Sequence, residues 1–160
     1  MRPTEMPSLF IVEDNSFYRN YLSEALAEEP FVIEAFSTGE TCMENLYRMP
    51  AVVVLDHQLG SMSGIEILKQ IKAFDPDIQV IVLSGQEDLE VAVNTLRFGA
   101  FDYLTKDDRT IIRLKSNLQK VQHFWAMAQE QQRKMQLMRW ALIGTMTALI
   151  ATTTALLIQL

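Results

Sequence analysis

The stretch VVVLDHQLGSMSGIEIL, residues 52–68, contains the pattern on which the fold prediction rests. It begins with a run of β-branched and apolar residues that ends at the acidic Asp56. A continuous apolar run is typical of a strand that is covered on both faces, as in a parallel sheet. Ile65, Leu68 and Ile71 then repeat every three residues, which indicates a helix after the strand. The stretch therefore predicts a strand, a loop and a helix, with an acidic side chain where the strand ends.

The same alternation of apolar runs and helical patterns extends on both sides of this stretch, up to residue 108. Alternating strands and helices predict an α/β fold with a doubly wound, five-stranded parallel sheet. Glu34 interrupts the second apolar run, which favours a place nearer the edge of the sheet for that strand. The predicted strands are 8–12, 31–36, 51–55, 78–83 and 101–104, and the predicted helices between them include 40–48, which Pro50 ends.

The last predicted helix starts near Arg109 and meets no Gly or Pro before Ile143. Its apolar residues step by alternating threes and fours, which is the heptad pattern of a coiled coil. The early positions could instead simply pack on the sheet as a fifth helix. We expect packing first and then a projecting stalk as far as residue 139, with pairing of two stalks as one option. The series is Ile111, Leu114, Leu118, Val121, Trp125, Ala128, Gln132 and Met135, and the polar Gln132 weakens its far end.

Residues 140–160, WALIGTMTALIATTTALLIQL, carry no charged side chain. As a helix they would span about 31 Å at ~1.5 Å per residue, close to the ~30 Å hydrocarbon core of a bilayer. Arg133, Lys134 and Arg139 precede the segment, Trp140 lies at its border, and no basic residue follows it. The sequence therefore predicts a transmembrane anchor in membrane lipid, with the N-terminal part at the cytoplasmic face of the inner cell membrane. A helix buried in the core is the alternative.

Charge is distributed unevenly along the chain, whose formal net charge is −6. Acidic side chains dominate residues 1–108, whereas basic side chains dominate 109–139, where Glu130 is the only acidic residue. An acidic globular part repels phosphates, so nucleic acid is not expected as a partner. Cys42 is the only cysteine, which excludes an internal disulfide.

Polar side chains with complementary chemistry follow the predicted strands at their carboxyl ends, where open α/β sheets carry their functional clefts. Three carboxylates that converge there would repel one another unless a cation joins them, and carboxylate oxygens suit Mg²⁺ or Mn²⁺. A hydroxyl and an ammonium at the same edge could bind the oxygens of a phosphoryl group. The set predicts metal-assisted transfer of phosphate to a carboxylate. Its members are Glu13, Asp14, Asp56, Ser84 and Lys106.

Four stretches closely resemble the receiver domains of bacterial two-component response regulators. They are FIVEDN (10–15), VVVLDHQLGSMSGIEIL (52–68), VIVLSGQ (80–86) and FGAFDYLTK (98–106). The resemblance covers residues 7–122 and implies a flavodoxin-like sheet with the strand order 2-1-3-4-5. Residues 1–6 then form an N-terminal tail, and the stalk and anchor follow the receiver domain.

The resemblance also implies a role for each acidic residue of the set. Asp56 would be the nucleophile that accepts a phosphoryl group from a histidine kinase or a phosphotransfer protein. Glu13 and Asp14 would hold Mg²⁺ directly or through water. Asp56 and the backbone carbonyl of Gln58 would complete the ligands that the protein supplies.

Three further residues receive roles by the same resemblance. Ser84 would contact the phosphoryl group, Lys106 would pair with one of its oxygens, and Tyr103 would turn inward as the switch aromatic when Ser84 moves. Gly60 and Asp107 stand where the family usually has proline. Because Asp107 follows Lys106 directly, it makes the placement of Lys106 uncertain from sequence.

We therefore expect a response regulator that signals at the membrane by protein contact or by dimerisation through its last helix. Beyond its own phosphorylation and dephosphorylation, no enzymatic activity is expected. The alternative is a membrane-tethered adaptor that uses a receiver fold for docking, without output that depends on phosphorylation. A phosphatase with an Asp nucleophile is disfavoured, because that class usually needs a second Asp where Gln58 stands.

Overall fold

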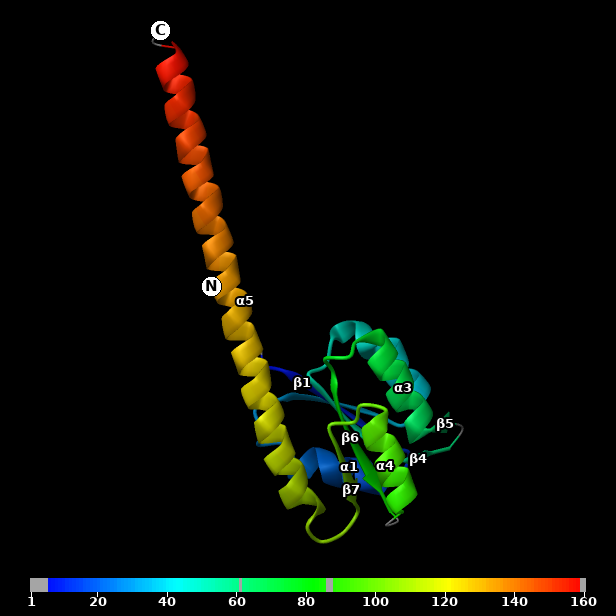
Figure 1. Cartoon of the computed structure of the whole chain (residues 1–160). Coiled ribbons are helices and arrows are strands. Elements are labelled where there is room, and N and C mark those ends of the chain that lie inside the picture. Colours follow the sequence, from blue (N-terminus) through cyan, green and yellow to red (C-terminus); the bar gives the residue numbers. More distant parts are fainter. Residues whose placement is uncertain (1–5, 61, 86–87, 159–160) are drawn as a thin grey trace. The chain divides into compact units, whose positions relative to one another are not determined.

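The computed structural model describes residues 6–60, 62–85 and 88–158, with the backbone alone at 149, 152–153 and 155–158 (Figure 1). The chain divides into two compact units, Met1–Gln122 and His123–Leu160. The first unit contains the sheet and the helices around it. The second consists of the later part of a single helix.

The main sheet of the first unit has five parallel strands: β1 (Ser8–Val12), β2 (Val32–Phe36), β3 (Val52–Asp56), β6 (Gln79–Ser84) and β7 (Asp102–Thr105). They lie side by side in the order β2-β1-β3-β6-β7. In chain order this is the predicted arrangement 2-1-3-4-5, so the predicted fold class is confirmed. β2 lies at an edge and is partly exposed, as the interruption by Glu34 indicated.

Helices cover both faces of this sheet and bury two separate groups of apolar side chains (Figure 1). On one face, α1 (Ser16–Ala25) and the first turns of α5 (Thr110–Ile158) pack against β1 and β3. On the other face, α2 (Gly39–Asn45), the short η1 helix (Leu46–Arg48) and α3 (Gly64–Phe74) pack against the same strands. The remaining helix, α4 (Leu89–Arg97), follows β6.

The central strand β3 explains why its sequence is apolar without alternation. Successive side chains of a strand point to opposite faces. Val52 and Val54 therefore lie in one apolar group, and Val53 and Leu55 lie in the other. Every residue of the strand is buried, including Asp56 at its end.

A small hairpin after β3 was not predicted. It pairs β4 (Gln58–Leu59) with β5 (Met62–Ser63) in antiparallel fashion. Gly60 allows the turn, because its φ of 35° lies in the left-handed region. A proline there could not adopt that angle. The Ser63 side chain then caps α3 in a reciprocal bond with Glu66, a capping box that the sequence S-x-x-E could have signalled.

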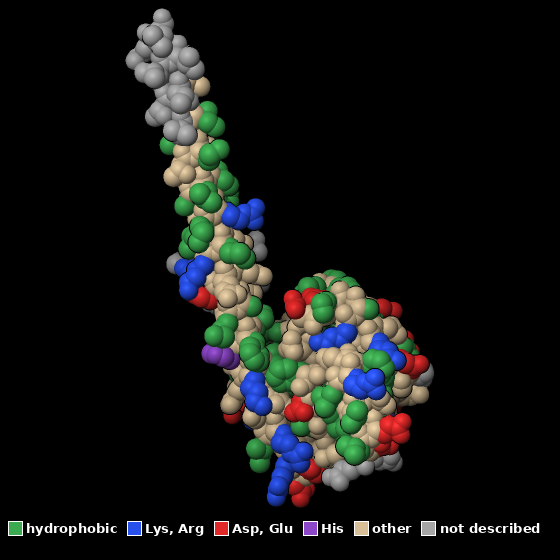
Figure 2. All heavy atoms as spheres, viewed as in Figure 1, with side chains coloured by type: hydrophobic (Ala, Val, Ile, Leu, Met, Phe, Trp, Pro, Cys, Tyr) green, Lys and Arg blue, Asp and Glu red, His purple; other side chains and the backbone are tan. Residues whose placement is uncertain are grey.

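The heptad positions of α5 have two different environments. Leu114, Leu118 and Val121 are buried against the sheet, which agrees with the packing expected of a fifth receiver helix. Beyond residue 122, Trp125 is half-buried and most of the other described large apolar side chains are exposed; Figure 2 shows hydrophobic and basic side chains along this part of the helix. Pairing of two stalks stays a prediction. The exposed residues include Met127, Met135, Leu137, Met138, Trp140, Leu142, Ile143, Met146 and Ile150.

The expected transmembrane anchor at 140–160 is not supported. Within the described part of the chain, no helix combines the length and apolar character needed to cross a bilayer. Helix α5 itself continues to Ile158, and the last two residues of the predicted anchor, 159 and 160, lie outside the described residues.

Gly64 provides a test of the packing between α3 and β3. A Cβ atom at this position would lie 2.5 Å from the carbonyl oxygen of Asp56 and 2.8 Å from the Cα of His57. Because both are backbone atoms, Gly64→Ala should lower the free energy of unfolding by about 1–3 kcal/mol. Urea denaturation measures this loss. The control is Gly144→Ala, where the new Cβ meets no described atom within 4 Å; equal losses in both variants would contradict the prediction.

Candidate functional site

Three acidic side chains meet at the carboxyl ends of two neighbouring strands. Glu13 and Asp14 follow β1, and Asp56 ends β3, which pairs with β1 in parallel. Each of the three residues offers an oxygen atom within 4.8 Å of the others. Glu13 and Asp56 are buried, whereas Asp14 is exposed. Three carboxylates at this spacing repel one another and present the hard oxygen donors that Mg²⁺ and Mn²⁺ prefer, so the residues fit the predicted metal.

Lys106 places a positive charge against two of these carboxylates. Its Nζ lies 2.7 Å from Oε2 of Glu13 and 3.1 Å from Oδ2 of Asp56. Its backbone N–H donates to the carbonyl of Ser84 at 2.7 Å, which anchors the residue beside the end of β6. The structure thus brings Lys106 to the predicted site even though it is followed by Asp107.

The burial of this group shifts the pKa of its members. Burial raises the pKa of Glu13, and the nearby charge of Asp56 raises it further, against the effect of the hydrogen bond with Lys106. For Lys106, burial acts to lower the pKa, but the hydrogen bond with Glu13 and the charge of Asp56 outweigh it and the pKa is raised. The ammonium therefore keeps its proton, and it provides the main compensation for the acidic charge.

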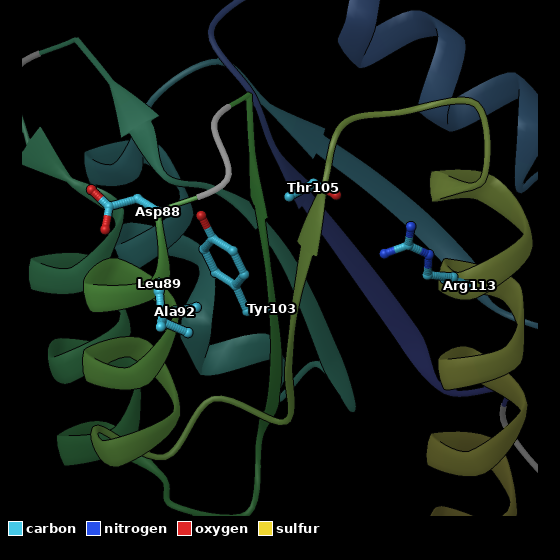
Figure 3. A pocket seen from close by; sticks show the side chains of 6 residues that line it. All are labelled: Asp88, Leu89, Ala92, Tyr103, Thr105 and Arg113. Atoms are coloured by element: carbon cyan, nitrogen blue, oxygen red, sulfur yellow. The ribbon is translucent and has the colours of Figure 1, made fainter.

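The other predicted site residues lie around this centre. Ser84 ends β6 and is buried. Gln58 is exposed in β4, and its backbone N–H donates to Oδ1 of Asp56 at 3.4 Å. Tyr103 in β7 is half-buried and extends toward α4 (Figure 3). The contact of Ser84 with phosphate, the switching of Tyr103 and the use of the Gln58 carbonyl as a ligand stay predictions.

A pocket that Tyr103 helps to line lies between α4, β7 and the start of α5. Figure 3 shows that its lining side chains come from all three elements. The exposed Leu89 on α4 and the guanidinium of Arg113 on α5 give it both apolar and charged walls. The complete lining is Asp88, Leu89, Ala92, Tyr103, Thr105 and Arg113.

Two residues that the sequence did not single out, Tyr18 and Arg19, contact the site from the first turns of α1. Nη1 of Arg19 donates to the carbonyls of Glu13 at 2.7 Å and Asp14 at 3.3 Å. The ring centroid of Tyr18 lies 4.5 Å from Nζ of Lys106. No local pattern could have signalled the second contact, because its two residues come from opposite ends of the domain.

The loop after Lys106 is held by hydrogen bonds. All described peptide bonds are trans, including the one to Asp107. Oδ1 of Asp107 accepts from the backbone N–H of Arg109 at 2.7 Å, and Oδ2 accepts from Thr105 at 3.1 Å and from Arg113 at 2.8 Å. The buried hydroxyl of Thr110 lies 2.8 Å from the carbonyl of Thr105 and 2.7 Å from that of Asp107. The negatively charged carboxylate of Asp107 is thus bonded at the start of α5.

Comparison with protein families gives one match across most of this unit. The model of the response regulator receiver domain matches residues 9–118. The chain is 36% identical over 99 residues to the DNA-binding transcriptional regulator NtrC of Escherichia coli (strain K12), a match that covers 61% of the chain and 21% of NtrC. It is 35% identical over 100 residues to the acid tolerance regulatory protein ActR of Sinorhizobium medicae, covering 62% of the chain and 52% of ActR. The chain thus spans about half or less of these relatives.

Solved structures support the same relationship. The BeF3-activated receiver domain of DrrB superimposes with a TM-score of 0.64 and 32% identity, and the match covers 71% of this chain and 98% of that domain. A response regulator receiver domain from Clostridium thermocellum gives a TM-score of 0.70 with 23% identity, over 76% of this chain and 98% of the other. At that identity the second match supports the fold alone.

The Asp107 carboxylate provides a test of the Lys106 loop. The hydrogen bond from Arg109, assisted by Thr105 and Arg113, lowers the pKa of Asp107 below its ordinary value of 3.8. An acid with a lowered pKa stabilises the fold above its ordinary pKa and loses this contribution as the pH falls through the lowered value. The stability difference between the wild type and Asp107→Asn should therefore shrink as the pH falls below 3.8.

Urea denaturation across that pH range measures this difference. Asp108→Asn is the control, because it removes the adjacent carboxylate and leaves the bonds of Asp107 in place. A difference for Asp107→Asn that does not depend on pH would show that its carboxylate does not stabilise the loop through its charge.

Proposed function

Because the chain belongs to the response regulator receiver family, on a match to residues 9–118, we propose that it is a signalling domain that accepts a phosphoryl group on Asp56. Phosphorylation of an aspartate is general in this family. The observation that carries the proposal is the position of Asp56. It is the buried end of β3, it shares an acidic cluster with Glu13 and Asp14, and its Oδ2 lies 3.1 Å from the ammonium of Lys106.

The proposed chemistry is nucleophilic transfer. The carboxylate of Asp56 attacks the phosphorus atom of the donor, a new O–P bond forms, and the bond from phosphorus to the donor breaks. With a phosphohistidine donor the leaving imidazole takes up a proton. Glu13, Asp14 and Asp56 would hold Mg²⁺, which when bound neutralises charge on the phosphoryl oxygens. The Lys106 ammonium, 3.1 Å from Oδ2 of Asp56, would neutralise further charge.

The partner that supplies the phosphate would be a histidine kinase or a phosphotransfer protein, as is general in the family. We propose output by protein contact, because the pocket beside Tyr103 joins α4, β7 and α5 at the surface. The exposed apolar side chains of α5 beyond residue 122 support a second route, dimerisation through this helix. In the alternative adaptor function, neither contact depends on Asp56.

Phosphorylation from acetyl phosphate tests the proposal. In the presence of Mg²⁺ the protein should gain one phosphoryl group, seen as a mass increase, and no increase should appear when a chelator is present from the start. Asp56→Asn should abolish the gain, because the amide is not a nucleophile of this kind. Asp14→Asn should raise the Mg²⁺ concentration needed, because it removes one carboxylate ligand.

Asp108→Asn is the matched control, since it removes one carboxylate outside the acidic cluster. Phosphorylation that persists in Asp56→Asn would overturn the assignment of the acceptor. If Asp56 is phosphorylated but neither partner binding nor oligomeric state changes, the adaptor function is the better description.

We also infer that residues 140–160 attach the domain to a membrane. The support is the uncharged sequence of this segment and the basic residues Arg133, Lys134 and Arg139 before it. Those residues face solvent in the described helix, where they are available to anionic lipid headgroups.

Sedimentation with vesicles of mixed neutral and anionic lipid tests the membrane attachment. The full chain should sediment with the vesicles, and Ile143→Asp combined with Ile150→Asp should release it, because the variant replaces apolar side chains that would contact the lipid with charges that anionic lipid repels. Gly144→Ala should not release it. If the double variant and the wild type partition alike, the attachment is refuted.

A further inference from the structure

The ammonium of Lys106 has a neutral neighbour besides its two carboxylates. The ring centroid of Tyr18 lies 4.5 Å from Nζ of Lys106, within the ~6 Å at which a cation is attracted to the face of an aromatic ring. The side chain of Lys106 is only 20% exposed. Weak hydration strengthens the attraction between a cation and a ring, so this contact is worth more here than at an open surface.

The first turns of α1 hold the Tyr18 ring in place. The backbone N–H of Tyr18 donates to the capping side chain of Asn15 at 3.0 Å. The ring is half-buried and packs against the apolar group beneath α1 and α5. The next residue, Arg19, bonds the backbone carbonyls of Glu13 and Asp14. One helix start therefore fixes the ring and the acidic residues together.

The ring differs from the carboxylates in how it responds to the proposed reaction. Glu13 and Asp56 attract Lys106 by charge, and that charge changes when a metal binds or when Asp56 becomes an acyl phosphate. The quadrupole of a tyrosine ring does not change in either event. A lysine has a flexible stem of four carbons, so a contact that persists through these changes can limit the positions of its ammonium.

We propose that Tyr18 is a positioning residue for phosphoryl transfer, whose ring holds the Lys106 ammonium beside Asp56 through the cycle of phosphorylation. The inference rests on the proposed function. It assigns no contact between Tyr18 and the phosphoryl group, and the effect of the residue passes through Lys106.

Two substitutions at Tyr18 separate the effect of its aromatic face from the effect of its apolar volume. Tyr18→Leu keeps an apolar side chain and removes the aromatic face. It should slow phosphorylation by acetyl phosphate by about 2- to 30-fold, because a cation–ring contact contributes ~0.5–2 kcal/mol. Tyr18→Phe keeps the face and should restore most of the lost rate. Tyr21→Leu is the control, because Tyr21 lies on the same helix with its ring centroid 5.7 Å from that of Tyr18.

A second measurement distinguishes positioning from general damage to α1. Because α1 also supports Glu13 and Asp14 through Arg19, a loosened helix would weaken Mg²⁺ binding, which calorimetry detects. The proposal requires a slower rate in Tyr18→Leu with no loss of Mg²⁺ affinity. An unchanged rate, a parallel loss of Mg²⁺ affinity, or an equal loss of rate in Tyr18→Phe would overturn it. If the wild type takes up no phosphate, the proposed function fails instead.

Discussion

The mutual repulsion of Glu13, Asp14 and Asp56 is the constraint on which the site depends. Carboxylates placed within 4.8 Å of one another are unfavourable in a partly buried place unless positive charge accompanies them. In this structure the positive charge comes from Lys106, at 2.7 Å from Glu13 and 3.1 Å from Asp56. The three carboxylates therefore favour the binding of a divalent cation. A negatively charged phosphoryl group would in turn be attracted by that cation and by Lys106.

The parallel sheet makes such a concentration of charge possible. The carboxyl ends of parallel strands lie at the same edge of the sheet, so residues that are distant in the sequence meet there. The three central strands, β1, β3 and β6, are apolar between their end residues, and their packing on both faces compensates for the cost of the acidic cluster. Gly64, seated against the backbone of Asp56, shows how closely the surrounding chain approaches this residue.

The strands and the position of the acidic cluster could be predicted from local patterns, an apolar run and the polar residue that ends it, whereas the order of the strands came from the family resemblance. The β4–β5 hairpin was missed, because two-residue strands have no periodicity to detect. Tyr18 was not singled out from sequence, because its contact is with Lys106, which local reasoning cannot place beside it. The sequence did not place Lys106, because Asp107 follows it; the structure places it through its backbone bond to Ser84 and its ion pairs with Glu13 and Asp56.

The loop from Lys106 to Thr110 belongs at once to the charged centre and to the beginning of α5. The Asp107 carboxylate and the Thr110 hydroxyl form hydrogen bonds within this loop, and these bonds restrain the loop between the charged centre and α5. A displacement of the Lys106 backbone must therefore either strain those bonds or be transmitted to the first turn of the helix. The loop therefore links the position of the Lys106 backbone mechanically to that of the first turn of α5.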